Sequence, residues 1–356
     1  MKKRKLLNTI DKISPSMLVA FEKCKLKFVL DRNIVKSKGG ANGFNPNSFM
    51  GTLIHKVLEG YYNELYDLNL FESKWEQCFK EVSGRISFDE QGINALEYIK
   101  YWVPAYYPKK LNTFKILTDY ALLPNAVVSS EKIVSFKNVH GIIDLFEKNG
   151  NKVRITDFKT GELYDIDNGV NVKVKEAYIS QLKAYGYIIF QTEKIEAENI
   201  ELTIKGLGIN QIYSFKCTRE DYLAQGLRID DLIESTNRII QSGNLDTLAN
   251  PFPKTCNFCN HLFSCNSFQN DIRIQPRKWK KIVLLKTINV KFDNSEQVIN
   301  VVINDRSISI HKVPEKDFTE IKKLNENGKE ILITQLFQVH NSNIKRWSKL
   351  TKYITI

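Results

Sequence analysis

Long apolar runs and nucleotide-binding loops are absent from this sequence. No stretch approaches the roughly 18 apolar residues of a membrane-spanning helix, so we expect no membrane association. No G-x-x-x-x-G-K-[S/T] loop is present, which excludes a recognisable ATP-driven motor within the chain. With 17 Gly and 9 Pro in 356 residues, and 42% hydrophobic residues, the composition excludes a collagen-like or disordered protein.

The first residues do not read as a secretion signal. A basic stretch from Lys2 to Lys5 is followed at once by Asn8, Asp11 and Lys12, which interrupt the apolar segment that a signal peptide needs. We therefore expect an intracellular protein. Thiols stay reduced there, so the six cysteines are expected to be free or metal-bound rather than paired in disulfides.

Positive charge exceeds negative charge. Lys and Arg number 52 against 40 Asp and Glu, a net charge of +12. Residues 277–356 hold 16 Lys or Arg and only 8 Asp or Glu, so they carry eight of those twelve charges. Such a surplus favours a polyanionic partner, most often nucleic acid.

The pattern of apolar residues predicts two domains. Helical spacing and strand-like runs alternate up to about residue 275, with strands expected at 116–123, 131–136, 141–147 and 152–157. We predict an α/β domain over residues 1–275 and a small, basic, β-rich domain over 276–356. In the second domain, Trp279, Trp347 and Tyr353 could stack on single-stranded bases, or could belong to a β-domain core or a protein-docking module.

The most informative segment is a predicted hairpin around Asn149-Gly150-Asn151. A turn at Asn149-Gly150 places Asp144 opposite position 155, whereas a turn at Gly150-Asn151 places it opposite Asp157. Cross-strand neighbours share a face, as do alternate residues of one strand. Either register therefore puts Asp144, Asp157 and Lys159 on one side.

Two carboxylates on one face repel each other unless a cation lies between them. A hard ion such as Mg²⁺ or Mn²⁺ takes oxygen ligands, could acidify a water molecule and could neutralise charge on a phosphate. Lys159 could orient that water or stabilise the oxyanion. The alternative is an exposed hairpin that carries a surface ion pair.

Two predicted helices carry further candidates. Gly51-Thr52-Leu53-Ile54-His55 opens one helix, and a neutral imidazole can complete a metal shell. Gln181 and Tyr185 lie one turn apart on another, where both can hydrogen-bond a phosphate or a water molecule. Taken singly, each also fits a structural role.

The cysteines predict a metal centre. Cys256, Cys259 and Cys265 form the pattern C-x2-C-x5-C, and a pair of cysteines two residues apart can bind one metal centre. A four-thiolate site needs one more ligand, for which Cys24 is the best candidate. A zinc knuckle, or His261 as the fourth ligand, fits the spacing as well.

Taken together, these residues resemble the RecB-like nucleases of the PD-(D/E)XK superfamily, most closely the iron–sulfur branch with AddB and the CRISPR-adaptation exonucleases. The pattern of that branch is a Ser-x-Ser start before a helical Cys, then G-x-x-x-H, G-x-x-D, D-x-K-T-G, Q-x-x-x-Y and C-x2-C-x5-C. The chain has each motif in this order over residues 14–270: Ser14 to Cys24, Gly51 to His55, Gly141 to Asp144, Asp157 to Gly161, Gln181 to Tyr185, and Cys256 to Cys265. The proline that usually follows the first cysteine is Lys25 here.

The resemblance implies a restriction-endonuclease-like core, a small mixed sheet flanked by helices, with a metal-dependent active site. It implies metal ligands from His55, Asp144, Asp157 and the backbone carbonyl of Phe158. It also implies a catalytic Lys159 supported by Gln181 and Tyr185, with Glu131 as a secondary candidate. Finally, it implies a structural [4Fe–4S] cluster on Cys24, Cys256, Cys259 and Cys265.

We therefore predict a Mg²⁺- or Mn²⁺-dependent deoxyribonuclease, an exonuclease acting on single-stranded DNA or duplex ends in repair, recombination or replication. Because the chain has no motor of its own, a helicase or a recombination protein is the candidate partner. The alternative is a catalytically auxiliary, nucleic-acid-binding subunit of a helicase–nuclease or DNA-integration complex.

Overall fold

The computed structural model describes residues 7–34, 46–84, 106–167, 171–207, 211–257, 259–279, 282–303, 306–339, 343–348 and 351–355. The chain divides into two compact units, each described here by itself. The central unit comprises Ile10–Val19 and Lys38–Ser235. The terminal unit comprises Met1–Thr9, Ala20–Ser37 and Thr236–Ile356. The domain boundary predicted near residue 275 stays a prediction.

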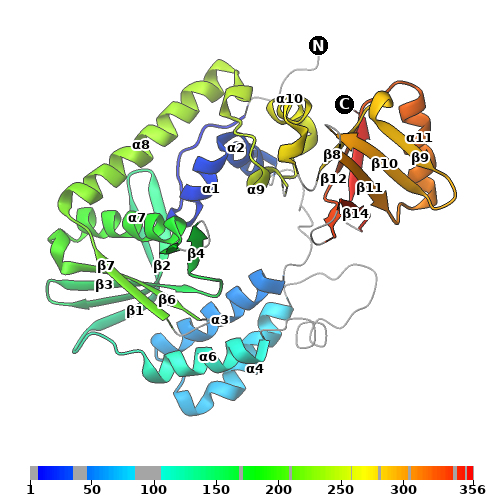
Figure 1. Ribbon diagram of the computed structural model, residues 1–356. Helices are drawn as coiled ribbons and strands as arrows, with labels where there is room; N and C mark the ends of the chain where they lie inside the picture. The colour runs from blue at the N-terminus through cyan, green and yellow to red at the C-terminus, as the bar shows by residue number, and fades with distance from the viewer. Residues whose placement is uncertain are drawn as a thin grey trace. The chain divides into compact units, whose positions relative to one another are not determined.

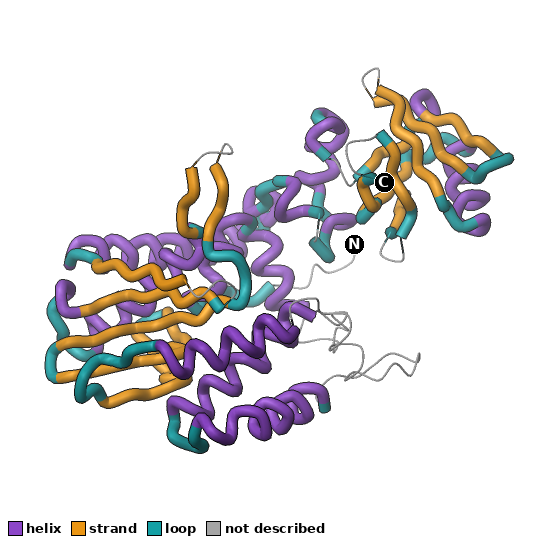
Figure 2. The backbone as a smooth tube through the Cα atoms, turned by 60° about the horizontal axis from the view of Figure 1, so that its bottom comes forward, coloured by secondary structure: helices purple, strands orange, loops and turns teal. Residues whose placement is uncertain are grey.

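A five-stranded mixed sheet forms the middle of the central unit (Figure 1). Its order is β1-β2-β3-β6-β7, and all neighbours are antiparallel except β3 and β6. The strands are β1 Val127–Phe136, β2 Val139–Asn149, β3 Lys152–Lys159, β6 Ile200–Gly206 and β7 Gln211–Lys216. A separate hairpin, β4 Tyr164–Asp167 with β5 Asn171–Val174, stands away from this sheet (Figure 2).

Helices flank both faces of the sheet (Figure 1). On one side lie α7 Glu176–Thr192 and α8 Arg219–Ser242; on the other lie α3 Pro46–Tyr62, α4 Phe71–Ser83 and α6 Tyr106–Asp119. Parallel strands cannot be joined by a tight turn, so the β3–β6 pair requires a crossover, which α7 supplies. Between α3, α4, α6 and the sheet, the core includes Leu53, Trp75, Leu145 and Phe158. The predicted fold class is confirmed: an α/β protein with a small mixed sheet flanked by helices.

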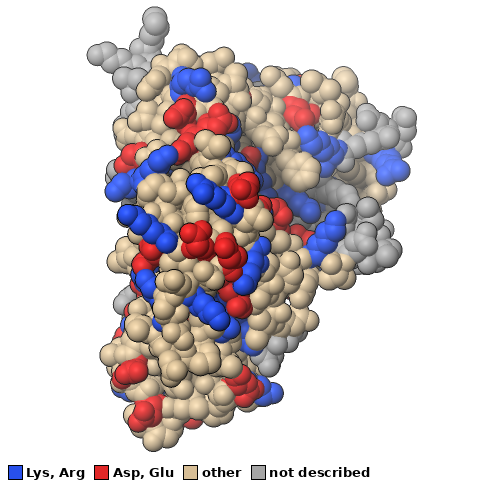
Figure 3. Space-filling view, turned by 90° about the vertical axis from the view of Figure 1, so that its left-hand side faces the viewer, with Lys and Arg blue, Asp and Glu red and all other residues tan. Residues whose placement is uncertain are grey.

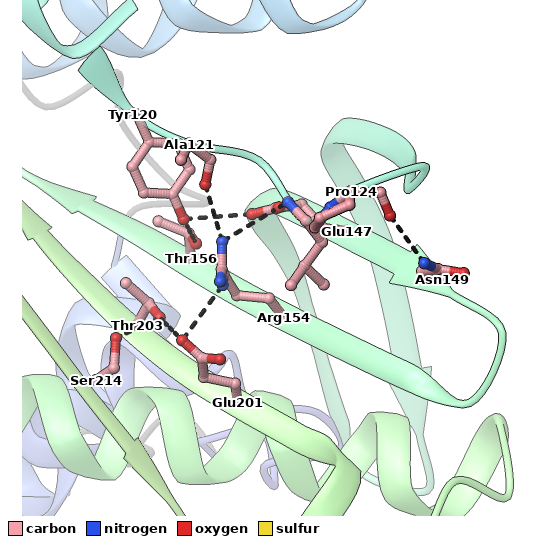
Figure 4. Close-up of polar contacts among 11 residues, drawn as sticks. Tyr120, Ala121, Pro124, Glu147, Asn149, Arg154, Thr156, Glu201, Thr203 and Ser214 are labelled. Atoms are coloured by element: carbon pink, nitrogen blue, oxygen red, sulfur yellow. Dashed lines mark hydrogen bonds and ion pairs between the residues drawn. The ribbon is translucent and has the colours of Figure 1, made fainter.

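A buried polar network holds the segment after α6 against the sheet (Figure 4). Glu147 is fully buried, accepts hydrogen bonds from the backbone N–H of Leu123 (2.6 Å) and the hydroxyl of Tyr120 (3.2 Å), and pairs with Arg154 (3.5 Å). Arg154 in turn donates to the carbonyl of Ala121 (3.0 Å). Because a buried carboxylate is stable only when its oxygens are satisfied, this network ties the loop to β2 and β3.

Two small sheets and several helices form the terminal unit. The sheets have the orders β13-β14-β11-β10-β9 and β15-β12-β8, and they enclose a core that includes Ile299, Ile310, Phe318 and Ile333. The strands are β8 Val283–Leu285, β9 Val290–Asp293, β10 Val298–Ile303, β11 Arg306–His311, β12 Ile331–Thr334, β13 Phe337–Gln338, β14 Ile344–Arg346 and β15 Lys352–Thr355. The helices are α1 Leu18–Lys23, which begins in the central unit, α2 Lys25–Ile34, α9 Pro253–Cys256, α10 Asn266–Ile274 and α11 Glu315–Glu326.

Some details differ from the sequence prediction. The apolar run 116–123 is not a strand, because α6 continues to Asp119 and buries Ile116 and Leu117 against the helical core. Trp279 is only 2% exposed and packs edge-on against Phe268, so it cannot stack on nucleic acid bases. Among the described residues, no helix is both long and apolar enough to cross a membrane.

Candidate functional site

The β2–β3 hairpin adopts one of the two registers expected from its turn. Asn149 pairs with Lys152, so the turn residues are Gly150 and Asn151, and Gly150 has the positive φ of 56° that glycine adopts without strain. The ladder ends at Leu145 opposite Thr156. One residue further on, the carboxylate of Asp144 accepts the backbone N–H of Phe158 at 2.8 Å.

This hydrogen bond fixes the Asp144 side chain where the two strands stop pairing. The carboxylate takes up a backbone donor of β3 at the point where the ladder ends, so it bridges β2 and β3. The ring of Phe158 is buried in the core between the sheet and helices α3, α4 and α6. Ligation by the backbone carbonyl of Phe158 stays a prediction.

His55 reaches the same place from α3. Its helix buries Leu53 and Ile54 in the core, which leaves the imidazole at the edge of the sheet. Nδ1 of His55 lies 3.4 Å from Oδ1 of Asp144 and 3.9 Å from Oε1 of Glu131. Burial alone would lower the pKa of His55, but the hydrogen bond and charge of Asp144, helped by the other carboxylates, raise it to about 9.

Glu131 is the third member of this group. It lies on β1 between Ser130, which pairs with Leu145, and Lys132, which pairs with Ile143, so it lies opposite Asp144. Its backbone has φ 52°, a left-handed conformation that is uncommon for a side-chain-bearing residue, and the pairing of β1 with β2 skips it. Burial and the neighbouring charge of Asp144 raise the pKa of Glu131 to about 7.

Asp157 and Lys159 form a second, more deeply buried cluster beside the first. Asp157 is 4% exposed; its Oδ1 accepts hydrogen bonds from Nζ of Lys159 (3.1 Å) and Nε2 of Gln181 (2.8 Å). Lys159 also donates to Oε1 of Gln181 at 2.9 Å, so the three side chains hold one another. Burial raises the pKa of Asp157 to about 6, although the Lys159 ammonium opposes the rise.

Tyr185 lines the cavity but contacts a different group. Its hydroxyl donates to the backbone carbonyl of Ile142 at 2.6 Å, and its ring lies over Gly141. A Cβ on Gly141 would lie 2.8 Å from that ring. Tyr185 thus holds β2 in place next to Asp144, whereas Gln181 makes the direct contact with Lys159 that the resemblance implies.

These groups surround one cavity of about 370 Å³. Its lining residues are Ser14, Ser16, His55, His140, Gly141, Ile142, Asp144, Asp157, Lys159, Gln181 and Tyr185. All six residues predicted from the sequence to be catalytic are therefore brought together.

The donor set suits a hard divalent ion. In the described part of the chain, one group of three candidate ligand atoms lies within 4.8 Å of one another, and it belongs to His55, Glu131 and Asp144. Oδ2 of Asp157 is buried, lies 2.8 Å from Nζ of Lys159, and accepts no well-aligned hydrogen bond from the described residues. Carboxylates with unused oxygens beside an imidazole fit Mg²⁺ or Mn²⁺.

Glu131, a secondary candidate in the sequence, lies beside His55 and Asp144 in the structure. Of the three residues whose ligand atoms lie closest together, His55 and Asp144 were expected as first choices and Glu131 only as a secondary candidate. Its position opposite Asp144 depends on the pairing of β1 with β2, which no short motif encodes. If the pairing of β1 with β2 is known, an acidic residue at position 131, across from Asp144, points to Glu131 as a further ligand.

The four cysteines expected to bind a cofactor line one cavity in the terminal unit, together with His261. Cys24 lies at the break between α1 and α2, Cys256 ends α9, and Cys259 and Cys265 follow in the next loop. Burial raises the pKa of all three later thiols, that of Cys256 to about 12.

His261 already has a partner. Its Nε2 lies 2.7 Å from Oδ1 of Asp31, and hydrogen bonds from His261 and Lys27 outweigh burial and lower the pKa of Asp31. The contact engages one ring nitrogen only, and histidines that bind a metal commonly have such a carboxylate partner, so Cys24 and His261 both stay candidates for a fourth ligand. No three sulfur atoms of the described cysteines lie within 4.8 Å of one another.

On at least one side of the molecule the charges are mixed rather than gathered into a positive patch (Figure 3). On the side shown in Figure 3, Lys and Arg side chains are interspersed with Asp and Glu. Opposite charges are paired along the chain as well: Lys132 and Lys148 both pair with Glu193, at 3.1 and 2.7 Å.

Comparisons with known proteins give one family. The sequence matches the family model described as "PD-(D/E)XK nuclease superfamily" over residues 12–266, more than half of the chain. Among curated proteins, no sequence matches significantly.

Two solved structures are similar to this chain at low scores. A "Putative exonuclease" from Eubacterium rectale is 14% identical, with a TM-score of 0.36 over 65% of this chain and 82% of that one. A protein named SSO0001 is 15% identical, with a TM-score of 0.27 over 62% of this chain and 97% of that one.

Proposed function

Because this chain belongs to the PD-(D/E)XK nuclease superfamily, we propose that it is an intracellular, metal-dependent deoxyribonuclease that degrades DNA from its ends. The observation that carries the proposal is the meeting of two clusters: His55 and Asp144 with Glu131 beside them, and Asp157 with Lys159. All of these residues except Glu131 line one cavity. The first cluster offers ligands for a hard cation, and the second offers a fixed ammonium group beside a buried carboxylate.

The metal ion would be held by His55, Asp144 and Asp157, with the carbonyl of Phe158, and Glu131 is close enough to join them. When bound, a divalent ion supplies a Lewis acid that neutralises charge developing on the phosphate. The chain's own carboxylates cannot do this, because they repel a phosphodiester.

Lys159 stabilises the charge that develops on the reacting phosphate or orients the attacking water. Its ammonium group lies within 3.1 Å of both oxygens of Asp157 and 2.9 Å from Gln181, so it does not have to be reoriented during the reaction. Preorganised charge of this kind contributes most where water is excluded, and the side chain of Lys159 is only 18% exposed. Gln181 is a positioning residue, since it contacts both partners.

We also propose that Cys24, Cys256, Cys259 and Cys265 hold a structural [4Fe–4S] cluster. The proposal is supported by the four cysteines lining one cavity and by the C-x2-C-x5-C spacing, which the resemblance ties to an iron–sulfur cluster. Such a centre would tie the start of α2 to the loop that follows α9.

The nuclease test uses DNA labelled at either end, single-stranded and duplex, with Mg²⁺, Mn²⁺ or EDTA. We expect metal-dependent release of short products from the wild type and none from Asp157→Ala/Lys159→Ala. The matched control is Lys137→Ala/Asp230→Ala, which removes an Asp–Lys pair of 3.2 Å whose residues do not line the cavity. Full activity in the first double variant would exclude this mechanism.

Binding of DNA without cleavage, with or without metal, would instead favour the auxiliary-subunit role. Because the sequence contains no ATP-driven motor, we propose that a helicase or recombination protein works with the nuclease in DNA repair, recombination or replication. Faster degradation of duplex DNA when a helicase and ATP are added would support that partnership.

The cluster test uses anaerobically purified protein. We expect a brown protein that absorbs near 400 nm and contains iron and sulfide, and we expect Cys24→Ser to lose them. The matched control is Cys78→Ser, since Cys78 is buried in α4 of the central unit. A colourless, zinc-containing protein, or unchanged iron in Cys24→Ser, would contradict the assignment.

A further inference from the structure

The segment before α1 lies directly against the catalytic strand β2. Ile13 forms an isolated parallel bridge with Val139. The backbone N–H of Ile13 donates to the carbonyl of Asn138 (2.9 Å), and the N–H of His140 donates to the carbonyl of Ile13 (3.0 Å). These bonds place the next residues, Ser14-Pro15-Ser16, beside the start of β2, although more than 120 residues separate them in sequence.

Side-chain packing keeps this turn in place. Pro15 is buried at the start of a short 3₁₀ helix, Pro15–Met17, and its Cδ lies 2.9 Å from the position that a Cβ on Gly141 would occupy. The ring of Tyr185 approaches the same position to 2.8 Å from the other side. Only glycine at position 141 lets both groups close on the strand, so the Ser-Pro-Ser turn forms a firm wall of the catalytic cavity.

Two hydroxyls of this turn line the cavity together with the imidazole of His140, which lies on the adjoining strand β2. Oγ of Ser14 lies 3.0 Å from Oγ of Ser16, and either can donate to the other. Ser14 precedes the 3₁₀ helix but makes no side-chain capping bond to it. Whichever serine donates, the hydroxyl hydrogen of the other remains available to an acceptor. The exposed His140 adds a ring that can donate from one nitrogen in either tautomer.

Ser14, Ser16 and His140 differ in chemistry from the carboxylates that line the same cavity. All three line the cavity together with Asp144 and Asp157, yet none of the three carries a negative charge. A DNA strand brings one phosphate per nucleotide, so when one phosphate lies at the catalytic carboxylates and their ion, its neighbour needs a site free of carboxylates. Hydroxyl and ring N–H donors are the groups that bind such backbone phosphates.

We propose that Ser14, Ser16 and His140 form a subsite for the DNA phosphate next to the one being cleaved. The subsite rests on the proposed nuclease function and deepens it, because it explains how a strand is positioned along the cavity. It contributes to substrate binding and alignment, while the chemistry stays with Asp157 and Lys159.

The test removes the charge of one phosphate at a time. Labelled hexanucleotides carry a single neutral methylphosphonate on the 5′ or the 3′ side of the bond whose cleavage is followed. In the wild type, we expect one of the two positions to lower kcat/KM about tenfold, the size expected for hydrogen bonds to a charged group. In Ser14→Ala/Ser16→Ala/His140→Ala, we expect both modified strands to be cleaved within about twofold of the unmodified strand.

Controls separate this subsite from the function on which it rests. Ser73→Ala removes an exposed serine of α4 that does not line the cavity, and it should behave as the wild type. If the wild type cleaves no unmodified DNA with any metal, the nuclease proposal fails. If it cleaves DNA but tolerates both methylphosphonates, or if the triple variant stays as sensitive as the wild type, the subsite is wrong while the nuclease stands.

The single variants Ser16→Ala and His140→Gln are measured in the same way, with thermal unfolding to verify the fold. Each is expected to keep part of the sensitivity to the methylphosphonate. A correctly folded variant that loses all cleavage of unmodified DNA would place these residues in the catalytic machinery, and that result would overturn the subsite.

Discussion

Replacing Asp157 by Asn should make the metal-free protein more stable while abolishing cleavage. Burial raises the pKa of this carboxyl from its ordinary value of 3.8 to about 6, so the folded state disfavours its charge. At 1.36 kcal/mol for each pH unit, the charged form costs about 3 kcal/mol. Below pH 3.8 the carboxyl is protonated in both the folded and the unfolded state, so its charge costs no stability. Between pH 3.8 and 6 the unfolded state ionises first, so the loss of stability grows as the pH rises. Above pH 6 this loss is complete.

Asparagine keeps the shape and an oxygen acceptor for Gln181, but it loses the attraction to Lys159, so we expect a net gain of about 1–3 kcal/mol at pH 8. The assay is urea unfolding in EDTA at pH 8 and at pH 4, where most of the gain should disappear. The control Asp230→Asn changes a carboxylate of a partly exposed ion pair and should stay within about 0.5 kcal/mol. An Asp157→Asn protein that is no more stable than the wild type at pH 8, or equally stabilised at both pH values, would refute the reasoning.

Three further predictions concern the same unit. Because the pKa of His55 is about 9 and that of Glu131 about 7, a metal ion that binds at pH 6.5 must displace protons from both groups. The rise in melting temperature caused by Mn²⁺ should therefore be larger at pH 8.5 than at pH 6.5. A rise that does not depend on pH would contradict this site. Gly141→Ala puts a methyl group 2.8 Å from the ring of Tyr185 and should lower the free energy of unfolding by about 1–3 kcal/mol and reduce kcat, and wild-type values would show that the wall is loose. Glu147→Ala removes the acceptor of Tyr120 and Leu123 and one of the two carboxylates beside Arg154, which keeps Glu201 at 3.3 Å. It should destabilise the protein by about 1–3 kcal/mol in urea without changing kcat in the folded protein, since it lies on the other face of the sheet; a loss below about 0.5 kcal/mol would mean that the network is dispensable.

The sequence predicts those parts of the site that depend on local geometry. The turn after Asn149 fixes a two-strand register, and a register fixes which side chains are neighbours, so Asp144, Asp157 and Lys159 could be grouped from sequence alone. The helical spacing of Gln181 places it on the face of α7 that covers Asp157 in the same way.

Features that depend on contacts far apart in the chain could not be read in this way. Glu131 reaches the site because β1 pairs with β2 and because its own backbone is left-handed. Neither feature can be predicted from the residue types along the chain. The run that begins at Ile116 has a strand-like composition, but packing against α3 and α4 keeps it helical. Trp279 was a candidate for base stacking because lysines surround it in sequence, whereas its ring is taken up by a second small core.

The parallel pairing of β3 with β6 has a consequence for the newly made protein. The hairpin that carries Asp144 and Asp157 can form within microseconds, but its inner strand gains a second neighbour only after α7 and residues 200–206 have left the ribosome. Until then the hairpin lacks Gln181, the residue that holds Lys159 against Asp157. A chain released early, or one whose β6 has not yet docked, therefore lacks the arrangement of Lys159 and Asp157 on which the proposed activity depends.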